Sequence, residues 1–156
     1  MEFFLNSGEG VAIQDGALQE EKMLGLMAEV LGRIHSLGRT QINEEVAFPM
    51  NVGKDYCVAT TRHDEIVFAQ RIGKNGVSRF VKGREPENTS YVTVRLKLNP
   101  PRNYVLVLAY FGKMRAPEIW EEPASFLYSR RFWMSHAYTW GSFPIVPGSQ
   151  TKFNSW

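Results

Sequence analysis

Residues 91–111 read YVTVRLKLNPPRNYVLVLAYF, and this stretch decides the fold of the chain. Polar or aromatic residues alternate with aliphatic ones from Tyr91 to Leu98, which is the two-residue period of a strand with one buried face. Residues 99–103 contain two prolines and predict a turn, after which Tyr104–Phe111 returns as an apolar strand. The stretch therefore predicts an antiparallel hairpin.

Further strand-like runs precede this hairpin. They are Glu45–Met50, Asp55–Thr60 and Asp64–Arg71, the last of which contains the continuous apolar run IVFA. Because these strands follow one another without intervening helices, the pattern predicts an α+β fold around an antiparallel sheet.

Two helices are predicted, one towards each end of the chain. Apolar residues recur at helical spacing over about Ala17–Leu37, and Gly25 and Gly32 lie on nearly one face, which another element is expected to approach closely. The second helix spans about Ala124–Tyr138. Its predicted stripe consists of Phe126, Leu127, Arg130, Trp133, Met134 and Ala137. Both helices are expected to pack on the sheet, and the tail is expected to be a pendant extension or a last edge strand.

The length of 156 residues and the apolar share of 44% predict a single domain over residues 1–156, with a helical part (1–40), a sheet with the second helix (45–140) and a tail (141–156). The single cysteine, Cys57, excludes an internal disulfide and a zinc site built on several thiolates. No apolar run approaches the ~18 residues of a membrane span, and the first residues do not resemble a signal peptide. No membrane contact and a cytoplasmic location are expected; the oligomeric state is left open.

The charge is divided unevenly along the chain. Residues 1–50 contain eight acids and three bases, a net charge of −5, and residues 51–156 contain the remaining 8 acids and 15 bases, a net charge of +7. A basic body is suited to a polyanionic partner, while a mixed solvated surface is the alternative interpretation. The segment Arg71–Arg84 is predicted to be a surface loop in which only 78–82 adds a strand, and it contains five cations and no acid.

Several classes of site are not indicated by the motifs. The sequence lacks GxGxxG, GxxxxGK[ST] and HExxH, and its three histidines, His35, His63 and His136, are far apart in the chain. No cofactor and no metal are therefore expected. Cys57 lies inside an apolar strand, where a buried structural thiol is expected rather than a nucleophile.

The remaining groups suit the cleavage of RNA without a metal. Such a reaction needs a base, an acid and donors for the phosphorane-like charge. We predict His63 and His136 as the acid–base pair, with Arg79 and Ser78 beside them. The residues expected to hold phosphate or RNA are Arg71, Lys74, Lys82, Thr93, Arg95 and Tyr110.

Each of these residues also has an ordinary structural interpretation. His63 is then a turn residue, His136 a core histidine and the basic segment a solvated surface, with the aromatic residues packing in the core. The alternative function is a non-catalytic module of a phage or mobile element that binds a nucleic acid or a protein. The partners considered are RNA, a protein antitoxin and a host factor.

Four blocks resemble a family of small uncharacterised bacterial proteins from mobile-element and plasmid neighbourhoods. The blocks are GKDYCVAT (53–60), DEIVFAQRIGKNGVSRFVKGREPENTSYVTVRL (64–96), YVLVLAYFGKMRAPEIW (104–120) and FWMSHAYTW (132–140). The family often has an Asp after the Trp, where this chain has Glu121. The family implies no established activity. In size, order of elements and residue types, the chain is also similar to metal-independent ribonuclease toxins of the barnase, colicin and RelE-like class, which implies RNA as the substrate.

Overall fold

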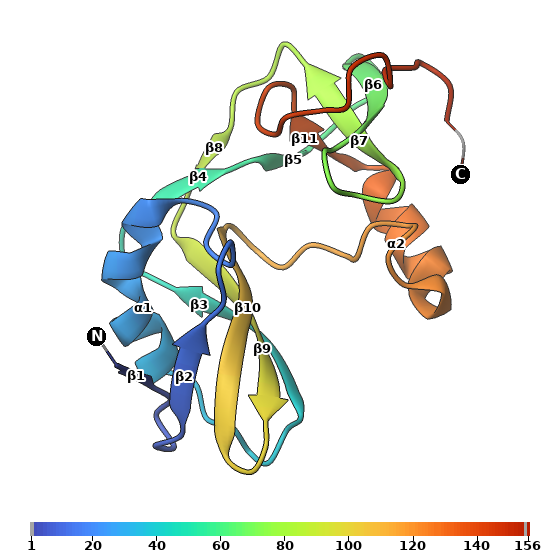
Figure 1. Cartoon of the computed structure of the whole chain (residues 1–156). Coiled ribbons are helices and arrows are strands. Elements are labelled where there is room, and N and C mark those ends of the chain that lie inside the picture. The colour runs from blue at the N-terminus through green and yellow to red at the C-terminus, as the bar shows by residue number, and fades with distance from the viewer. Residues whose placement is uncertain (1, 155) are drawn as a thin grey trace. The chain divides into compact units, whose positions relative to one another are not determined.

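A computed structural model describes residues 2–154 and 156 (Figure 1). In this part of the chain, short helices combine with a five-stranded, a four-stranded and a two-stranded sheet, in which most neighbouring strands are antiparallel. The prediction of an α+β fold with antiparallel pairing is thus confirmed. The prediction of one sheet is wrong, because the strands divide among three.

The chain forms two compact units, where the sequence predicted one domain. Unit 1 consists of Met1–Lys54 and Asn88–Met114, and unit 2 consists of Asp55–Glu87 and Arg115–Trp156. Each unit is therefore assembled from two separate stretches of the sequence. The chain passes from unit 1 to unit 2 after Lys54 and returns to unit 1 after Glu87. These two crossings lie in the strands of the two-stranded sheet, β4 (Gly53–Asp55) and β8 (Glu87–Thr89).

The five-stranded sheet of unit 1 contains the predicted hairpin. Strand β9 (Tyr91–Asn99) pairs antiparallel with β10 (Asn103–Phe111), so the hairpin and its turn are confirmed. The remaining strands are β1 (Phe3–Phe4), β2 (Gly10–Ile13) and β3 (Gln41–Ala47), in the order β1-β2-β10-β9-β3. The aliphatic side chains of β9 fill the core as their alternation predicts, since Val92, Val94 and Leu96 are completely buried.

Helix α1 (Leu24–Gly32) covers the core of unit 1 and follows the 3-10 turn η1 (Glu21–Met23). The predicted helix Ala17–Leu37 is too long at both ends. Ala17 accepts a hydrogen bond from the backbone N–H of Ala109 at 2.8 Å, so the segment before α1 is held against β10 instead. At the other end Leu37 has a φ of +51°, which a right-handed helix does not accommodate.

The predicted close approach at Gly25 and Gly32 is wrong, because no atom lies within 4 Å of a Cβ placed at either position. Two other glycines leave no room for a side chain: a Cβ would lie 2.5 Å from the Phe111 ring at Gly53 and 2.2 Å from the Trp120 side chain at Gly76. The face of α1 that contains Gly25 is thus open.

Two glycine substitutions are expected to act in opposite directions. Gly25→Ala should raise the free energy of unfolding of unit 1 by roughly 0.5–1 kcal/mol, because alanine favours a helix and finds open space. Gly53→Ala should lower it by roughly 1–3 kcal/mol, because the Phe111 ring must move. Amide hydrogen exchange of β9 and β10 measures both effects. A loss of protection in Gly25→Ala would show that the open face of α1 is covered in solution.

The four-stranded sheet of unit 2 has the order β5-β11-β7-β6. Its strands are β5 (Cys57–Ala59), β6 (Glu65–Gln70), β7 (Val77–Lys82) and β11 (His136–Thr139). Strand β7 occupies the second half of the segment that the sequence predicted as a basic loop. The strand 78–82 that the prediction allowed within this segment is therefore confirmed, and β7 begins one residue earlier, at Val77.

The C-terminal tail lies along the outer edge of β6. Backbone hydrogen bonds of 2.8 Å join Phe68 to Thr151 in both directions, and the N–H of Val146 donates to the carbonyl of Gln70 at 2.8 Å. Of the two possibilities for the tail, the structure shows an edge extension of the sheet rather than a pendant segment.

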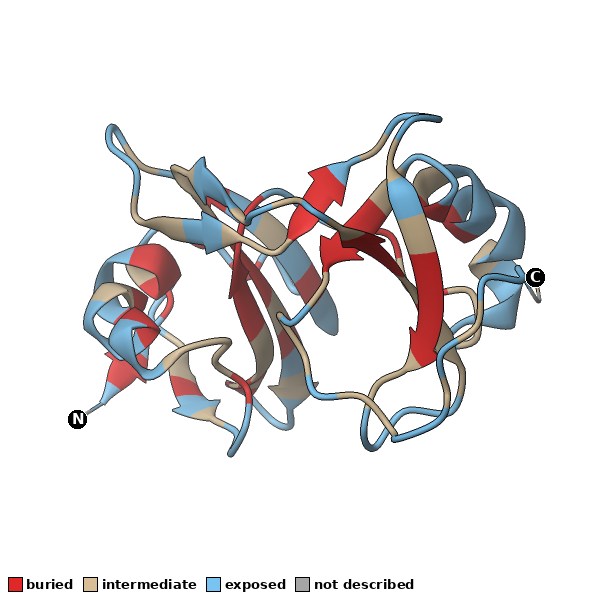
Figure 2. Ribbon diagram, turned by 90° about the horizontal axis from the view of Figure 1, so that it is seen from above, coloured by how far each residue is buried: buried red, intermediate tan, exposed pale blue. Residues whose placement is uncertain are grey.

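Helix α2 (Phe126–Trp133) is shorter than the predicted helix Ala124–Tyr138, because residues 136–139 form strand β11. The predicted buried stripe is also wrong. Ser129 and Trp133 are 0% and 2% exposed, whereas Leu127 is 80% exposed. The indole N–H of Trp133 donates to the carbonyls of Ala116 and Pro117 at 3.2 and 3.1 Å, and these bonds fix which side of the helix is buried. Figure 2 shows α2, close to the C-terminus, largely in the colour of exposed residues.

Candidate functional site

The predicted site residues belong to both units. Thr93, Arg95 and Tyr110 lie in unit 1, and the others lie in unit 2. Thr93 is buried and its hydroxyl donates to the carbonyl of Gly112 at 2.7 Å, while Arg95 donates from Nε to Oδ1 of Asn43 at 3.2 Å. Tyr110 is buried as well. These side chains have structural roles inside unit 1.

Arg71 and Ser78 form a buried cluster with Glu118. Glu118 was not among the site residues predicted from the sequence. Arg71 Nη2 and the Ser78 hydroxyl both donate to the Glu118 carboxylate. The Arg71 guanidinium also lies 5.1 Å from the Tyr138 ring centroid and 4.7 Å from that of Phe143. An arginine held in this way is not available to hold a phosphate.

Burial has the largest effect on the pKa of several side chains in unit 2. It raises the pKa of Glu118 even though Arg71 acts in the opposite direction, and it raises the pKa of Asp55 against the effect of Arg115, whose Nη2 lies 3.0 Å from Asp55 Oδ1. Burial also raises the pKa of Cys57 to about 12. The Cys57 thiol is thus protonated at neutral pH, which agrees with a structural role.

Arg79 and Ser78 are consecutive residues of β7, so their side chains point to opposite faces of the sheet. Arg79 Nη1 donates to the Thr60 hydroxyl at 2.8 Å and to the His136 carbonyl at 3.0 Å. Burial lowers the pKa of Arg79. This arginine connects two segments of unit 2, and it does so on the face opposite Ser78.

The two histidines have different surroundings. The His136 ring stacks on Phe132 with centroids 4.1 Å apart, and its Nδ1 lies 3.0 Å from the Phe132 carbonyl and 3.0 Å from the Ser135 hydroxyl. A proton on Nδ1 satisfies that carbonyl and leaves Nε2 as the acceptor. His63 lies exposed in the turn before β6, where its N–H donates to the Thr61 hydroxyl at 3.2 Å. Among residues 2–154 and 156 no hydrogen bond joins the two histidines, and their pairing stays a prediction.

The other cations of the basic segment differ in their availability. Arg84 pairs with Asp64 at 3.2 Å and with Glu87 at 3.5 Å. The ammonium of Lys82 lies 5.1 Å from the Trp140 ring centroid, and Lys74 is exposed in the β6–β7 turn. Arg71 and Arg79 also contact side chains or carbonyls of unit 2. Most cations of this segment therefore have partners within unit 2.

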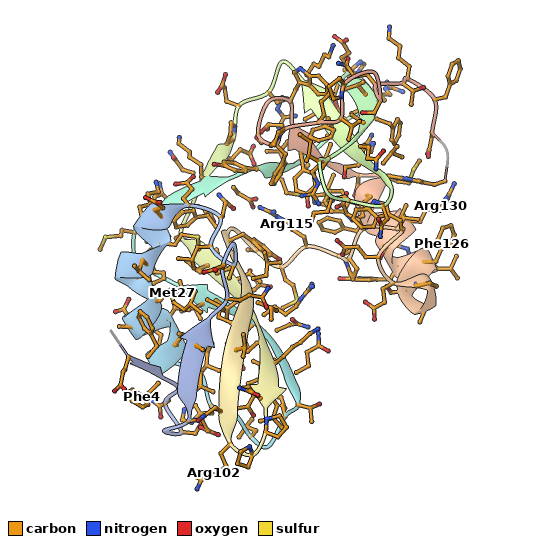
Figure 3. The ribbon with its side chains drawn as sticks, viewed as in Figure 1. Phe4, Met27, Arg102, Arg115, Phe126 and Arg130 are labelled. Atoms are coloured by element: carbon orange, nitrogen blue, oxygen red, sulfur yellow. The ribbon has the colours of Figure 1, made fainter. Side chains whose placement is uncertain are left out.

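A different group of side chains is exposed together on α2. We call it the α2 surface; it consists of Phe126, Leu127, Tyr128, Arg130, Arg131 and Met134, all of which are exposed. Figure 3 shows Phe126 and Arg130 projecting outward from the helix. Within the described part of the chain, neither Arg130 nor Arg131 forms an ion pair.

The segment that contains the α2 surface has no acidic side chain, and the tail adds further apolar area. Residues 123–156 contain no Asp or Glu, and the acids before them, Glu121 and Glu122, precede the helix. The tail meets the surface at Met134, whose sulfur lies 3.7 Å from Asn154 Nδ2. Phe153, next to Asn154, is 83% exposed. The α2 surface is therefore apolar and cationic, and its end is extended by the tail.

No group of three or more His, Cys, Asp or Glu side chains in the described ranges is arranged to hold a metal ion. None of the helices described is both long enough and apolar enough to cross a bilayer.

The comparisons with known proteins assign no family to this chain. The resemblance to mobile-element proteins and to ribonuclease toxins stays a prediction. No family model, no curated protein and no solved structure matches the sequence or fold described above.

Proposed function

We propose that this protein is a non-catalytic binding module that holds an anionic macromolecule on the α2 surface. The observation that supports the proposal is the exposure of Arg130 and Arg131, which form no ion pair with the residues that the structure describes, beside four large apolar side chains. Residues 123–156, to which all six belong, provide no carboxylate to neutralise them. An anionic partner supplies the missing charge.

The apolar part of the α2 surface also favours a binding role. Helix α2 buries only Ser129 and Trp133, with Phe132 partly buried, and leaves the other side to solvent. A contiguous exposed patch of large apolar residues marks an interaction site more often than a chance arrangement does. Phe, Tyr, Met and Arg, which make up most of the α2 surface, are the residue types that interfaces enrich.

The contacts of the predicted catalytic residues support binding over catalysis. Ser78 donates to Glu118 in a buried cluster, and Arg79 uses one nitrogen for two contacts on the opposite face. A ribonuclease site requires its acid, base and phosphate donors around one reacting phosphate. The described contacts engage Ser78 and Arg79 on opposite faces of the sheet, and this supports the binding module.

The proposal is tested by titrating the protein into two fluorescent polyanions, poly-L-glutamate and oligouridylate, and measuring anisotropy. We expect binding that weakens steeply between about 50 and about 200 mM salt. Arg130→Glu combined with Arg131→Glu should weaken it by roughly tenfold or more, because two favourable charges become repulsive. The matched control, Arg62→Glu combined with Lys74→Glu, makes the same change in net charge at exposed positions of unit 2 outside the α2 surface. Equal losses in both double variants would contradict a specific site.

The same oligouridylate samples, incubated with EDTA, separate binding from cleavage. We expect the RNA to remain at full length. Cleavage that His63→Ala and His136→Ala each abolish would overturn the proposal and support the metal-independent ribonuclease hypothesis.

A further inference from the structure

We infer that the partner bound by the α2 surface is an acidic, amphipathic α-helix of another protein. This inference rests on the proposed function and names the chemistry of the macromolecule. It follows from the geometry of the exposed residues, from their chemical types and from the hydrogen bonding of the α2 backbone.

The exposed residues form a stripe with helical periodicity. Leu127, Arg130 and Met134 occupy positions i, i+3 and i+7, so they lie in one row along α2. Seven residues of helix extend about 10 Å, which is about two turns. A row of this kind fits the groove between two rows of side chains on a second helix.

The apolar members of this row, Leu127 and Met134, favour a protein over a nucleic acid, although the rings of Phe126 and Tyr128 are exposed on the same helix. Leu127, at 80% exposure, is among the most exposed large apolar side chains of the described chain, and Met134 is exposed beside it in the row. Aliphatic side chains offer no flat ring for base stacking, whereas they gain free energy when they meet other apolar side chains. Protein surfaces that bind nucleic acids are also much more positively charged than the α2 surface with its two arginines.

The arginines require an acidic partner. When a partner covers the stripe, Arg130 and Arg131 lose part of their hydration, and a buried cation without a counter-ion is strongly unfavourable. Residues 123–156 contain no Asp or Glu, and within the described part of the chain no ion pair involves either arginine, so we assign the compensating charge to the partner. Glu or Asp residues three or four positions apart on a helix lie on one side of it and can meet both guanidinium groups.

A helical partner also has the hydrogen-bonding groups of its own backbone satisfied. An extended peptide needs a free strand edge to pair its N–H and C=O groups. The α2 backbone is hydrogen-bonded within the helix, so the surface offers side chains and no strand edge. A partner whose backbone is satisfied internally can cover the stripe without leaving polar groups unpaired.

The experiment compares three fluorescent probes in anisotropy titrations. The first is a designed peptide with Leu at i, i+3/i+4 and i+7 and Glu at the flanking positions, the second has the same composition in an order without a stripe, and the third is oligouridylate. We expect the amphipathic peptide to bind at least about tenfold more tightly than its isomer, because only the first presents a continuous apolar row. It should gain helical circular dichroism when it binds.

The decisive variant is Leu127→Ser combined with Met134→Ser, and Ile72→Ser is its control. Ile72 is also an exposed apolar residue of unit 2, but it lies in the β6–β7 turn. The double variant should remove the tenfold preference for the amphipathic peptide, while Ile72→Ser should preserve it. The thermal unfolding of both variants should match that of the wild type, because each substituted side chain is exposed.

Two results would overturn the inference. One is equal binding of the two peptides, and the other is tighter binding of oligouridylate that does not depend on Leu127 and Met134. In either case, binding that still depends on Arg130 and Arg131 would leave the proposed function intact. If no probe responds to the charge reversal of those arginines, both the inference and the proposed function are wrong.

Discussion

Glu118→Ala is expected to lower the free energy of unfolding of unit 2 by roughly 3–5 kcal/mol, the usual effect of removing one partner from a buried ion pair. The side chains of Arg71 and Glu118 are 12% and 7% exposed, so water does not replace the carboxylate at the Arg71 guanidinium. The Ser78 hydroxyl loses its acceptor at the same time. Tryptophan fluorescence during urea unfolding reports this change selectively, because Trp120, Trp133, Trp140 and Trp156 all belong to unit 2.

Matched substitutions separate the charge of Glu118 from its hydrogen bonds. Glu118→Gln retains an acceptor for Arg71 or Ser78 and should cost much less than alanine, because burial already raises the pKa of Glu118 and the fold therefore tolerates its neutral form. Replacing both members of the pair by Arg71→Met and Glu118→Leu should recover most of the loss. Glu122→Gln, at an exposed position, should have no effect. A loss in Glu118→Gln as large as that in Glu118→Ala would show that the negative charge itself holds Arg71.

The same pair predicts how stability depends on pH. The folded-state pKa of Glu118 lies above its ordinary value of 4.5, so the folded protein binds this proton more tightly than the unfolded chain does. The resulting stabilisation is fully present below about 4.5 and is lost as the pH rises through the folded-state pKa. Wild-type stability should therefore fall relative to that of Glu118→Gln as the pH is raised from acidic to neutral.

Trp133→Ala is expected to destabilise unit 2 by roughly 3–5 kcal/mol, because it removes a large side chain from a packed core. Trp133 is 2% exposed, and it packs in the core that contains Phe80 and Tyr138. Its indole N–H also satisfies the carbonyls of Ala116 and Pro117. Urea unfolding followed by far-ultraviolet circular dichroism measures the loss, since the substitution removes one of the fluorescent residues.

Two further variants make the Trp133 prediction specific. Trp133→Phe retains most of the ring but not the N–H, and should cost roughly 1–3 kcal/mol for the carbonyls that lose their donor. Leu127→Ala, on the same helix at 80% exposure, should change stability by less than about 0.5 kcal/mol. A large loss in Leu127→Ala would mean that the α2 surface is covered within the protein, and it would contradict the assignment of this surface to a partner.

The hairpin Tyr91–Phe111 could be predicted because its information is local. Each residue of β9 faces the core or the opposite side according to its place in a two-residue alternation. The burial of Val92, Val94 and Leu96 follows that pattern. By contrast, the division into two units depends on which distant stretches pack together, and neither composition nor periodicity records this.

The errors at α2 have a physical cause that the sequence pattern does not contain. Apolar residues of this helix recur on more than one side, so its orientation is chosen by tertiary contacts of Trp133 with residues 16 and 17 positions earlier. Glu118 was missed for a similar reason, because its partner Arg71 lies 47 positions away. Residue types alone grouped Ser78 with Arg79, although adjacent strand positions point to opposite faces.

The position of β11 in its sheet has a consequence for synthesis on the ribosome. This strand is made after β5, β6 and β7, yet it lies between β5 and β7, so it is the element that joins them. All residues of unit 1 have been made once residue 114 has emerged from the ribosome. At that point β5, β6 and β7 have also been made, but residues 136–139, which pair with β5 and β7, have not. During that interval the edges of β5 and β7 that β11 later covers have no strand partner. Unpaired strand edges promote aggregation, and chaperones protect nascent chains that expose them. The nascent chain thus has all of unit 1 available before unit 2, whose sheet stays open until residues 136–139 have been made.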